Sequence, residues 1–333
     1  MLTRQNALNE WLAALPSLPA FTLTPLAGDA SFRRYFRLKT AEKHLVVMDA
    51  PPTKEGLLTF IQIGHLLSTH GIHTPHVLAV DLDQGFALLE DLGDTLLLNG
   101  LSPDNMDARY TAAMDTLITI QQCPTSDPKL PLFDAPFMQQ EMDLFRTWFL
   151  DALLGLTLSP REEKHLSQTF RTLTTHLSCQ PQRFIHRDYH SRNLLIVGEQ
   201  TPPEIGVIDF QDAMLGPFTY DLVSLLKDCY LHWPDEKRTQ WMTYFYKKLP
   251  RTEGWSLSEF QHGLDWCGLQ RHLKVLGIFS RLHLRDKKSA YLRDLPLTLH
   301  HTMSCLARYD VFGPLHELMQ QRVLPAFEEK QPA

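Results

Sequence analysis

The stretches FIHRDYHSRNLLIV, residues 184–197, and IGVIDFQD, residues 205–212, decide the fold. Within them, the apolar runs LLIV and IGVI flank a polar turn that contains two prolines, and this order predicts a β-hairpin. Asn193 immediately precedes the first expected strand, and Asp209 immediately follows the second. In an antiparallel pair these positions should lie opposite one another, with their Cα atoms about 5 Å apart.

The residue types around this hairpin are those that phosphoryl transfer requires. Mg²⁺ prefers hard oxygen ligands, which the amide of Asn193 and the carboxylate of Asp209 supply. Asp188 lies in the loop that enters the hairpin, where it can accept the proton of an attacking hydroxyl. The order His-Arg-Asp, four residues, Asn and then Asp-Phe is typical of kinases. We therefore expect an enzyme that uses ATP and Mg²⁺, with Asp188 as its catalytic base.

The composition of the chain argues against nucleic-acid-binding, disulfide-rich and membrane proteins. The chain has 333 residues, is 44% hydrophobic and carries a net charge of -6 without long blocks of like charge, which makes nucleic acid an unexpected partner. Its five cysteines include no CxxC pair, so we expect reduced thiols and a cytoplasmic protein. No apolar run approaches the roughly 20 residues that span a bilayer. We expect no membrane association and a monomer.

The order of predicted elements indicates an α+β, bilobal protein-kinase-like fold. The runs SFRRYFRL, HLVVMDA, HVLAVD and GFALLED predict strands, and a helix at 57–70 that ends at Gly71 lies between the second and third runs. These form a small β-rich N-lobe, residues 1–93. Its last residues, from Glu90 through Leu92 to 93, are expected to be the hinge whose backbone binds adenine. Residues 94–333 form a mainly helical C-lobe with the catalytic loop and acceptor site. Helical patterns cover 105–122, 139–155, 160–178, 219–231, 236–248, 258–284 and 297–308.

Longer strings carry a resemblance to a known family: GDASFRRYFRL, VVMDAPP, HRDYHSRNLL, VIDFQDAMLGPFTYDLVSLLKD and LQRHLKVLGIFSRL. On these, the chain resembles the aminoglycoside phosphotransferase and choline kinase superfamily. Within it, the chain is similar to the bacterial anomeric kinases of N-acetylmuramate and N-acetylglucosamine over nearly its whole length. The resemblance implies transfer from ATP to the anomeric hydroxyl, giving a sugar 1-phosphate for peptidoglycan recycling. It also implies that the turn with Gly28, Asp29 and Ser31 covers the phosphates of ATP.

The chain departs from the protein kinase pattern on one strand. Where protein kinases carry Val-Ala-Ile-Lys, this chain ends its run with Asp49, which cannot pair with phosphate. The cationic role could pass to an arginine of the preceding strand: Arg33, Arg34 or Arg37. Strand alternation places Arg33 and Arg37 on one face and Arg34 on the other. Asp49 could hold one of these arginines or contact the sugar. Glu55 could join the same network or be an ordinary exposed acid.

The acceptor is expected to be neutral or anionic, because basic residues exceed acidic ones between 261 and 293. The basic residues there include Arg271, Lys274, Arg281, Arg285, Lys287, Lys288 and Arg293. We expect Arg271 to pair with the lactyl carboxylate of a muramic acid, and Gln211 and Asp212 to bind sugar hydroxyls. Tyr220 and Asp221 should lock the loop after the metal site onto the next helix, and His186 should pack beneath that site.

Two other functions remain open at this point. A phosphotransferase of the same kind could act on an amino alcohol or an aminoglycoside instead of a sugar. A non-catalytic nucleotide-binding regulator is the third possibility, and the intact Asp188, Asn193 and Asp209 argue against it.

Overall fold

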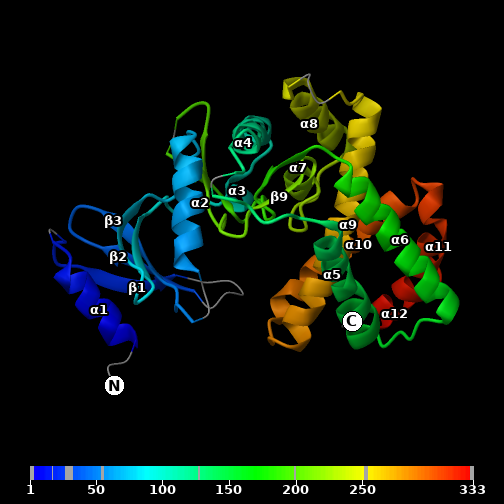
Figure 1. The fold of residues 1–333 in the computed structure, drawn as a ribbon, viewed down its shortest axis with the longest axis horizontal. Helices are drawn as coiled ribbons and strands as arrows, with labels where there is room; N and C mark the ends of the chain where they lie inside the picture. Colours follow the sequence, from blue (N-terminus) through cyan, green and yellow to red (C-terminus); the bar gives the residue numbers. More distant parts are fainter. Residues whose placement is uncertain are drawn as a thin grey trace.

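The computed structural model describes residues 4–16, 18–26, 33–53, 56–126, 128–198, 200–250 and 254–330. An antiparallel sheet with helices α1 and α2 forms one lobe, and a larger, mostly helical lobe lies beyond α2 (Figure 1). The predicted bilobal α+β fold is confirmed. The boundary expected after residue 93 stays a prediction. Among the described helices, none combines the length and apolar character that crossing a membrane requires.

The N-lobe sheet has five strands in the order β1-β2-β3-β5-β4, and every neighbouring pair is antiparallel. The strands are β1 (Thr22–Leu26), β2 (Arg34–Lys39), β3 (His44–Asp49), β4 (Val77–Asp81) and β5 (Phe86–Glu90). The four predicted strands are confirmed, whereas β1 was not predicted. Its sequence TLTPL contains Pro25, which argues against a central strand but is tolerated at the edge of a sheet, where β1 lies.

Two helices cover the opposite faces of this sheet. Helix α1 (Arg4–Ala14) packs Leu8 and Leu12 against inward side chains that include Val47 and Leu88. Helix α2 (Leu57–Thr69) lies on the other face, between the sheet and the C-lobe (Figure 1). It ends as predicted, since Gly71 has a φ of 82° and so closes the helix in the left-handed region. The face under α2 therefore belongs to the interior of the molecule, and the face under α1 lies away from the C-lobe.

Asp49 lies on the α1 face, together with Leu45 and Val47. Its carboxylate is fully buried and accepts hydrogen bonds from Arg4 Nε at 2.6 Å and from Arg34 Nε at 3.0 Å, with a second contact from the Arg34 guanidinium. The predicted contact of Asp49 with the sugar is therefore wrong, because its carboxylate is fully buried on the face that α1 covers. The contact of Arg34 with the nucleotide stays a prediction. The alternative prediction, that Asp49 holds an arginine of the preceding strand, is confirmed by its contacts with Arg34.

The C-lobe is built from helices and two small antiparallel sheets. The sheets pair β6 (Gln182–Ile185) with β9 (Met214–Pro217), and β7 (Leu194–Val197) with β8 (Glu204–Val207). The first of these pairs was not predicted. The helices are α3 (Leu97–Gly100), α4 (Met106–Gln121), α5 (Ala135–Leu144), α6 (Pro160–Ser178), α7 (Tyr220–Leu226), α8 (Asp235–Lys248), α9 (Leu257–Leu284), α10 (Leu295–Leu306), α11 (Gly313–Leu318) and α12 (Leu324–Lys330). A π-helix (Phe145–Leu153) continues α5, and 3₁₀-helices cover Ser289–Asp294 and Asp310–Phe312.

Helix α9 is the central element of the C-lobe (Figure 1). It starts with a capping box, in which Ser256 and Glu259 each satisfy a backbone N–H of the other residue. Gly277 lets the backbone of α5 approach closely, since a Cβ at this position would lie 2.3 Å from the carbonyl carbon of Leu144. This close contact brings the middle of α9 against α5 and the catalytic loop, with Arg271 and Lys274 both buried between them.

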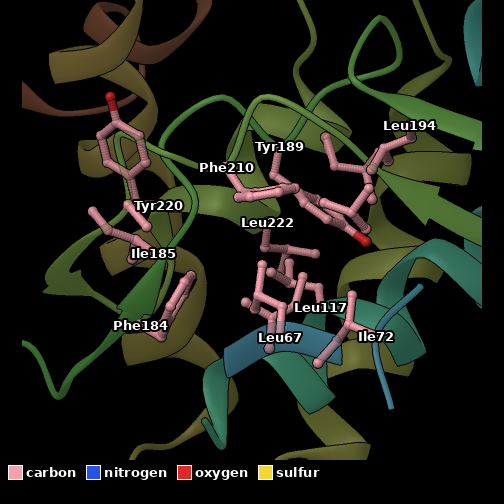
Figure 2. Packing of buried hydrophobic residues seen from close by; sticks show 14 of the residues in the cluster. Leu67, Ile72, Leu117, Phe184, Ile185, Tyr189, Leu194, Phe210, Tyr220 and Leu222 are labelled. Carbon is pink, nitrogen blue, oxygen red and sulfur yellow. The ribbon is translucent and has the colours of Figure 1, made fainter. Parts of the chain in front are cut away.

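A continuous apolar core joins the two lobes. Figure 2 shows Leu67 of α2 near Leu117 and Ile72, in the same cluster of buried side chains as Tyr189 and Phe210 of the C-lobe. The ring of Phe210 stacks on Phe60 of α2 with centroids 4.8 Å apart, and Gly64 leaves room for it. The phenylalanine of the Asp-Phe motif thus anchors α2 beside the catalytic hairpin. The five cysteines are free thiols, as predicted.

Replacing Asp49 tests whether it fastens α1 to the sheet. We expect Asp49→Ala to lower the free energy of unfolding by about 1–3 kcal/mol, because it removes the shared acceptor of two arginines. Urea denaturation measures this loss. Asp83→Ala, in the exposed turn before β5, is the control and should change the free energy by less than about 0.5 kcal/mol. Equal values for the two variants would contradict the anchoring role.

Candidate active site

The predicted catalytic hairpin is present, with a register that differs by one residue from the expected one. Leu194 pairs with Val207, and the backbone N–H of Ile208 donates to the carbonyl of Asn193 at 3.1 Å. Ile208 therefore lies opposite Asn193, and the prediction that Asp209 would do so is wrong, because β8 ends one residue earlier than expected. Asp209 is the next residue and has a φ of 64°. This left-handed conformation turns the chain away from the strand direction.

The side chains of Asn193 and Asp209 fit a hard cation. Asn193 donates its Nδ2 to the backbone carbonyl of Asp188 at 2.9 Å, which leaves its Oδ1 as the atom that can bind a metal. Desolvation raises the pKa of Asp209, and the negative charges of Asp188 and Asp212 raise it further, while a hydrogen bond from Gln211 at 2.8 Å opposes this. A concentration of negative charge of this kind is relieved by a bound cation.

The protein offers few metal-binding side chains around Asn193 and Asp209. Within the ranges that the structure describes, no group of three His, Cys, Asp or Glu side chains could hold a metal ion. Mg²⁺ suits such a site, because it binds one or two protein oxygens and takes the other ligands from water and phosphate. The donor set of Asn193 and Asp209 therefore fits Mg²⁺ that arrives with a nucleotide.

Asp221 fixes the backbone of the catalytic loop. Its fully buried carboxylate accepts the N–H of His186 at 2.6 Å and the N–H of Arg187 at 2.9 Å. Burial raises the pKa of Asp221 to about 6, against the effect of His186 and these two hydrogen bonds. Sequence reasoning expected Asp221 to hold the loop after the metal site. The structure corrects this, because its partners precede Asp188.

His186 packs beneath the site, as predicted. Its Nε2 donates to the carbonyl of Ile208 at 3.0 Å, and its Nδ1 accepts the N–H of Asp188 at 3.3 Å. Burial, the largest influence, lowers the pKa of His186 and keeps the ring neutral. The imidazole therefore links the end of β8 to the catalytic loop and is not placed as a base.

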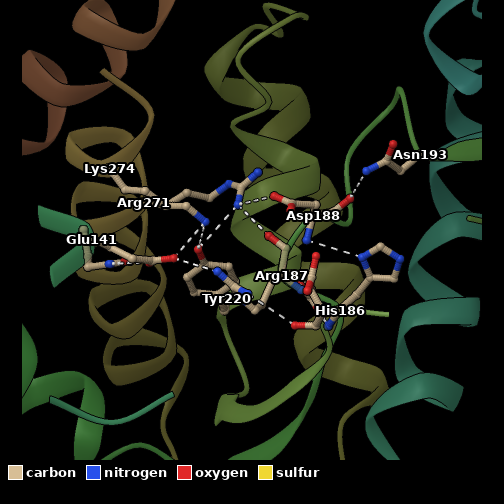
Figure 3. Close-up of polar contacts among 11 residues, drawn as sticks. Glu141, His186, Arg187, Asp188, Asn193, Tyr220, Arg271 and Lys274 are labelled. Atoms are coloured by element: carbon tan, nitrogen blue, oxygen red, sulfur yellow. Dashed lines mark hydrogen bonds and ion pairs between the residues drawn. The ribbon is translucent and has the colours of Figure 1, made fainter. Parts of the chain in front are cut away.

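A buried group of charges surrounds the chain next to Asp188 (Figure 3). Glu141 of α5 pairs with Arg187 at 2.9 Å and with Lys274 at 3.1 Å. Lys274 also donates to the hydroxyl of Tyr220 at 3.3 Å. Sequence reasoning did not single out Glu141, and it counted Lys274 only among the basic residues. The available signal was the spacing of Arg271 and Lys274, which places two cations on one face of the helix.

Arg271, the predicted partner of a substrate carboxylate, lies beside the predicted catalytic base. It is buried, and its guanidinium donates to the backbone carbonyl of Arg187 at 2.7 Å and lies 3.5 Å from Asp188 Oδ1. The contact of Arg271 with a substrate carboxylate stays a prediction, since these contacts use only its Nη1. Desolvation favours a raised pKa for Asp188, but the charges of Lys274 and Arg271 lower it well below its ordinary value. The side chain of Asp188 is 39% exposed, so a ligand can reach it.

The two residues after Asp209 occupy different environments. Gln211 is buried and donates to Asp209, whereas Asp212 is exposed and its backbone carbonyl accepts from Arg187 at 3.4 Å. Their expected contacts with sugar hydroxyls stay predictions.

The expected hinge forms several polar contacts. The carboxylate of Glu90 accepts from His73 and from the N–H of His76, each at 3.2 Å, and Leu92 packs over Gly206 of β8. Arg37, on the face of β2 toward the interior, pairs with Asp91 at 2.6 Å. The backbone contacts of Glu90 and Leu92 with adenine stay predictions.

The remaining nucleotide predictions concern the start of β2 and the turn before it. Arg33 is buried directly before β2 and stays a candidate for a phosphate contact. Gly28, Asp29, Ser31 and Glu55 lie outside the described residues.

The role of Asp221 can be tested without any substrate. In Asp221→Asn, the amide group would face one of the two backbone N–H donors, so we expect the free energy of unfolding to fall by about 1–3 kcal/mol. Hydrogen exchange should show faster exchange of the His186 and Arg187 amides. Asp143→Asn, at an exposed position of α5, is the control and should leave both quantities unchanged. Unaltered protection of these two amides in Asp221→Asn would refute the assignment.

Known proteins share this architecture and sequence. The pattern of the phosphotransferase enzyme family matches residues 22–255. An N-acetylmuramate/N-acetylglucosamine kinase of Pseudomonas aeruginosa is 38% identical over 331 residues, covering 95% of this chain and 96% of that protein. The kinase of the same name from Pseudomonas putida is 37% identical, covering 96% of this chain and 92% of that protein.

Solved structures agree on the fold. The GDP complex of aminoglycoside 2'-phosphotransferase-IIIa superimposes with a TM-score of 0.65 at 16% identity, covering 91% of this chain and 99% of that chain. At this identity the likeness shows the fold alone. Together with the family match and the full-length relatives, it shows that the chain belongs to the phosphotransferase enzyme family and is a kinase related to the N-acetylmuramate/N-acetylglucosamine kinases.

Proposed function

We propose that this kinase transfers the γ-phosphoryl group of ATP to the anomeric hydroxyl of N-acetylmuramate, N-acetylglucosamine or both. The product is the sugar 1-phosphate, which returns cell-wall sugars to nucleotide-sugar synthesis. The names of the full-length relatives support the sugar. We further propose that the protein works as a monomer in the cytoplasm, where ATP and reduced thiols coexist.

The observation that carries this proposal is the position of Asp188 relative to Asn193 and Asp209. Asn193 is hydrogen-bonded to the backbone of Asp188, and the charge of Asp188 raises the pKa of Asp209, so base and metal-binding groups share one site. Mg²⁺ held by Asn193 and Asp209 would neutralise charge on the phosphates of ATP. The remaining chemistry is the orientation of the acceptor hydroxyl and the removal of its proton.

Asp188 would receive that proton. Its low pKa keeps it ionised at neutral pH, and Arg271 fixes one of its oxygens. A carboxylate of this kind is a weak base, which is sufficient because the transition state of phosphoryl transfer needs little proton removal. The hydroxyl of a hemiacetal also releases its proton more readily than an ordinary alcohol. An anomeric acceptor therefore suits the base that the site provides.

The charges around Asp188 disfavour an aminoglycoside acceptor. Three cations lie in this region: Arg187 and Lys274, which pair with the buried carboxylate of Glu141, and Arg271, which lies beside Asp188. A polycationic acceptor would meet like charge there, at a cost that rises in a desolvated site. A neutral or anionic sugar meets no such repulsion.

Product analysis with a base variant tests this function. We expect the wild-type protein with ATP and Mg²⁺ to convert N-acetylmuramate or N-acetylglucosamine to the 1-phosphate, as identified by mass spectrometry and ³¹P NMR. Choline and kanamycin should give no product. Asp188→Asn should lower kcat by roughly 10²–10⁴-fold with the fold retained, because the general base is lost. Asp104→Asn, an exposed control, should retain full activity.

Two results would contradict the proposal. Phosphate on the 6-hydroxyl would refute the anomeric position, and turnover of choline or kanamycin in place of both sugars would refute the sugar. Full activity of Asp188→Asn would remove Asp188 from its role as base.

A further inference from the structure

Arg192 is a fixed cation of the catalytic loop whose polar groups are not used by the protein. It lies between Asp188 and Asn193 in the sequence, and its guanidinium carbon lies over the ring of Tyr230, 3.9 Å from the ring centroid. Stacking of this kind holds a guanidinium in one plane while its N–H groups stay available. Within the described part of the chain, Arg192 forms no ion pair and no hydrogen bond.

The other arginines of this region are committed to the protein. Arg187 pairs with Glu141, and Arg271 donates to the carbonyl of Arg187. Arg192 is half-buried, as Arg187 is, but it differs from both because its guanidinium has no hydrogen-bond or ion-pair partner among the described residues. It is thus the guanidinium of the catalytic loop that remains available to a ligand.

The position of Arg192 is built into the fold by Asp228. This buried carboxylate accepts the N–H of Ser191 at 2.9 Å and the N–H of Tyr230 at 3.0 Å. It therefore fastens the residue before Arg192 to the residue that carries the stacking ring. The Tyr230 ring is held in turn by His190, at 5.3 Å between centroids. A site organised in this way loses little conformational entropy when a ligand binds.

Three buried polar atoms near this stack have no hydrogen-bond partner among the described residues: His190 Nδ1, Ser191 Oγ and Asp294 Oδ2. His190 contacts the Tyr230 ring, and Ser191 directly precedes Arg192. Burial raises the pKa of Asp294, and the charge of Arg192 is the largest influence that lowers it, so the two side chains lie in the same region. Buried polar atoms are normally paired, so these three indicate a ligand with several polar groups. A sugar has such groups.

We propose that Arg192 is the specificity residue that binds the carboxylate of an acidic amino sugar. A planar guanidinium with free N–H groups matches a carboxylate in a two-pronged hydrogen bond, and this geometry is specific to arginine. A neutral sugar would leave Arg192 hydrated at its half-exposed position, which carries little cost. The proposal rests on the proposed function and adds to it the group that favours N-acetylmuramate over N-acetylglucosamine.

The test compares the two sugars in one set of variants. Arg192→Gln should lower kcat/KM for N-acetylmuramate by roughly 10–100-fold, the loss expected for charged hydrogen bonds, chiefly through KM. The value for N-acetylglucosamine should stay within about twofold, which also shows that the variant is folded. Arg192→Lys should recover part of the loss, since it keeps the charge without the planar fork. Arg171→Gln, at an exposed position of α6, is the matched control and should leave both values unchanged.

The ratio of the two kcat/KM values decides the result. An equal loss for both sugars, with a raised KM for ATP, would assign Arg192 to the phosphates and overturn the proposal. No loss for either sugar would also overturn it, as would a wild-type protein that phosphorylates N-acetylglucosamine but not N-acetylmuramate. Failure of the proposed function looks different, because the wild-type protein would then phosphorylate neither sugar.

Discussion

The active site depends on the two hydrogen bonds that Asp221 accepts from the backbone of the catalytic loop. His186 and Arg187 point their N–H groups at one buried carboxylate, and Arg187 adopts a positive φ of 74° that an ordinary residue keeps only when its surroundings fix it. The side chain of the next residue, Asp188, is 39% exposed, so a ligand can reach it. Without a buried acceptor, both N–H groups would be unpaired in the interior and the loop would favour other conformations.

A second constraint is electrostatic: the charges buried next to Asp188 need partners of opposite charge. Burial of an unpaired charge is costly, and the region next to Asp188 contains Glu141, Arg187, Arg271 and Lys274 in close contact. Glu141 pairs with Arg187 and Lys274, and Arg271 lies beside Asp188, so each buried charge has an opposite charge near it. The positive charges of Lys274 and Arg271 lower the pKa of Asp188. The same residues of α5, α9 and the catalytic loop therefore contribute to stability and set the charge of the site.

The predictions succeeded for features that depend on residues close together in the sequence. They failed for features that depend on how distant segments pack. The hairpin, α2 and the position of His186 follow from apolar periodicity and from a motif of short range. The register was wrong by one residue, because polar Glu204 extends β8 at its start and Ile208 falls outside it. Strand alternation correctly separated Arg34 from Arg37, but it could not show that α1 covers the face with Asp49. Arg271 was expected to contact the substrate because the sequence does not show how deeply a residue on a helix is buried.

The sequence by itself determined the two-lobed architecture, the kinase chemistry and the identity of Asp188, Asn193 and Asp209 as the candidate reactive groups. These follow from residue types at short spacing along the chain, which can be read without any tertiary contact. Only the tertiary structure decided that Asp49 fastens α1, that Arg271 supports the catalytic loop and that Arg192 stays available over Tyr230. The physical reason is that a charged side chain takes its role from its partner, and these partners lie between about 40 and 85 residues away along the chain.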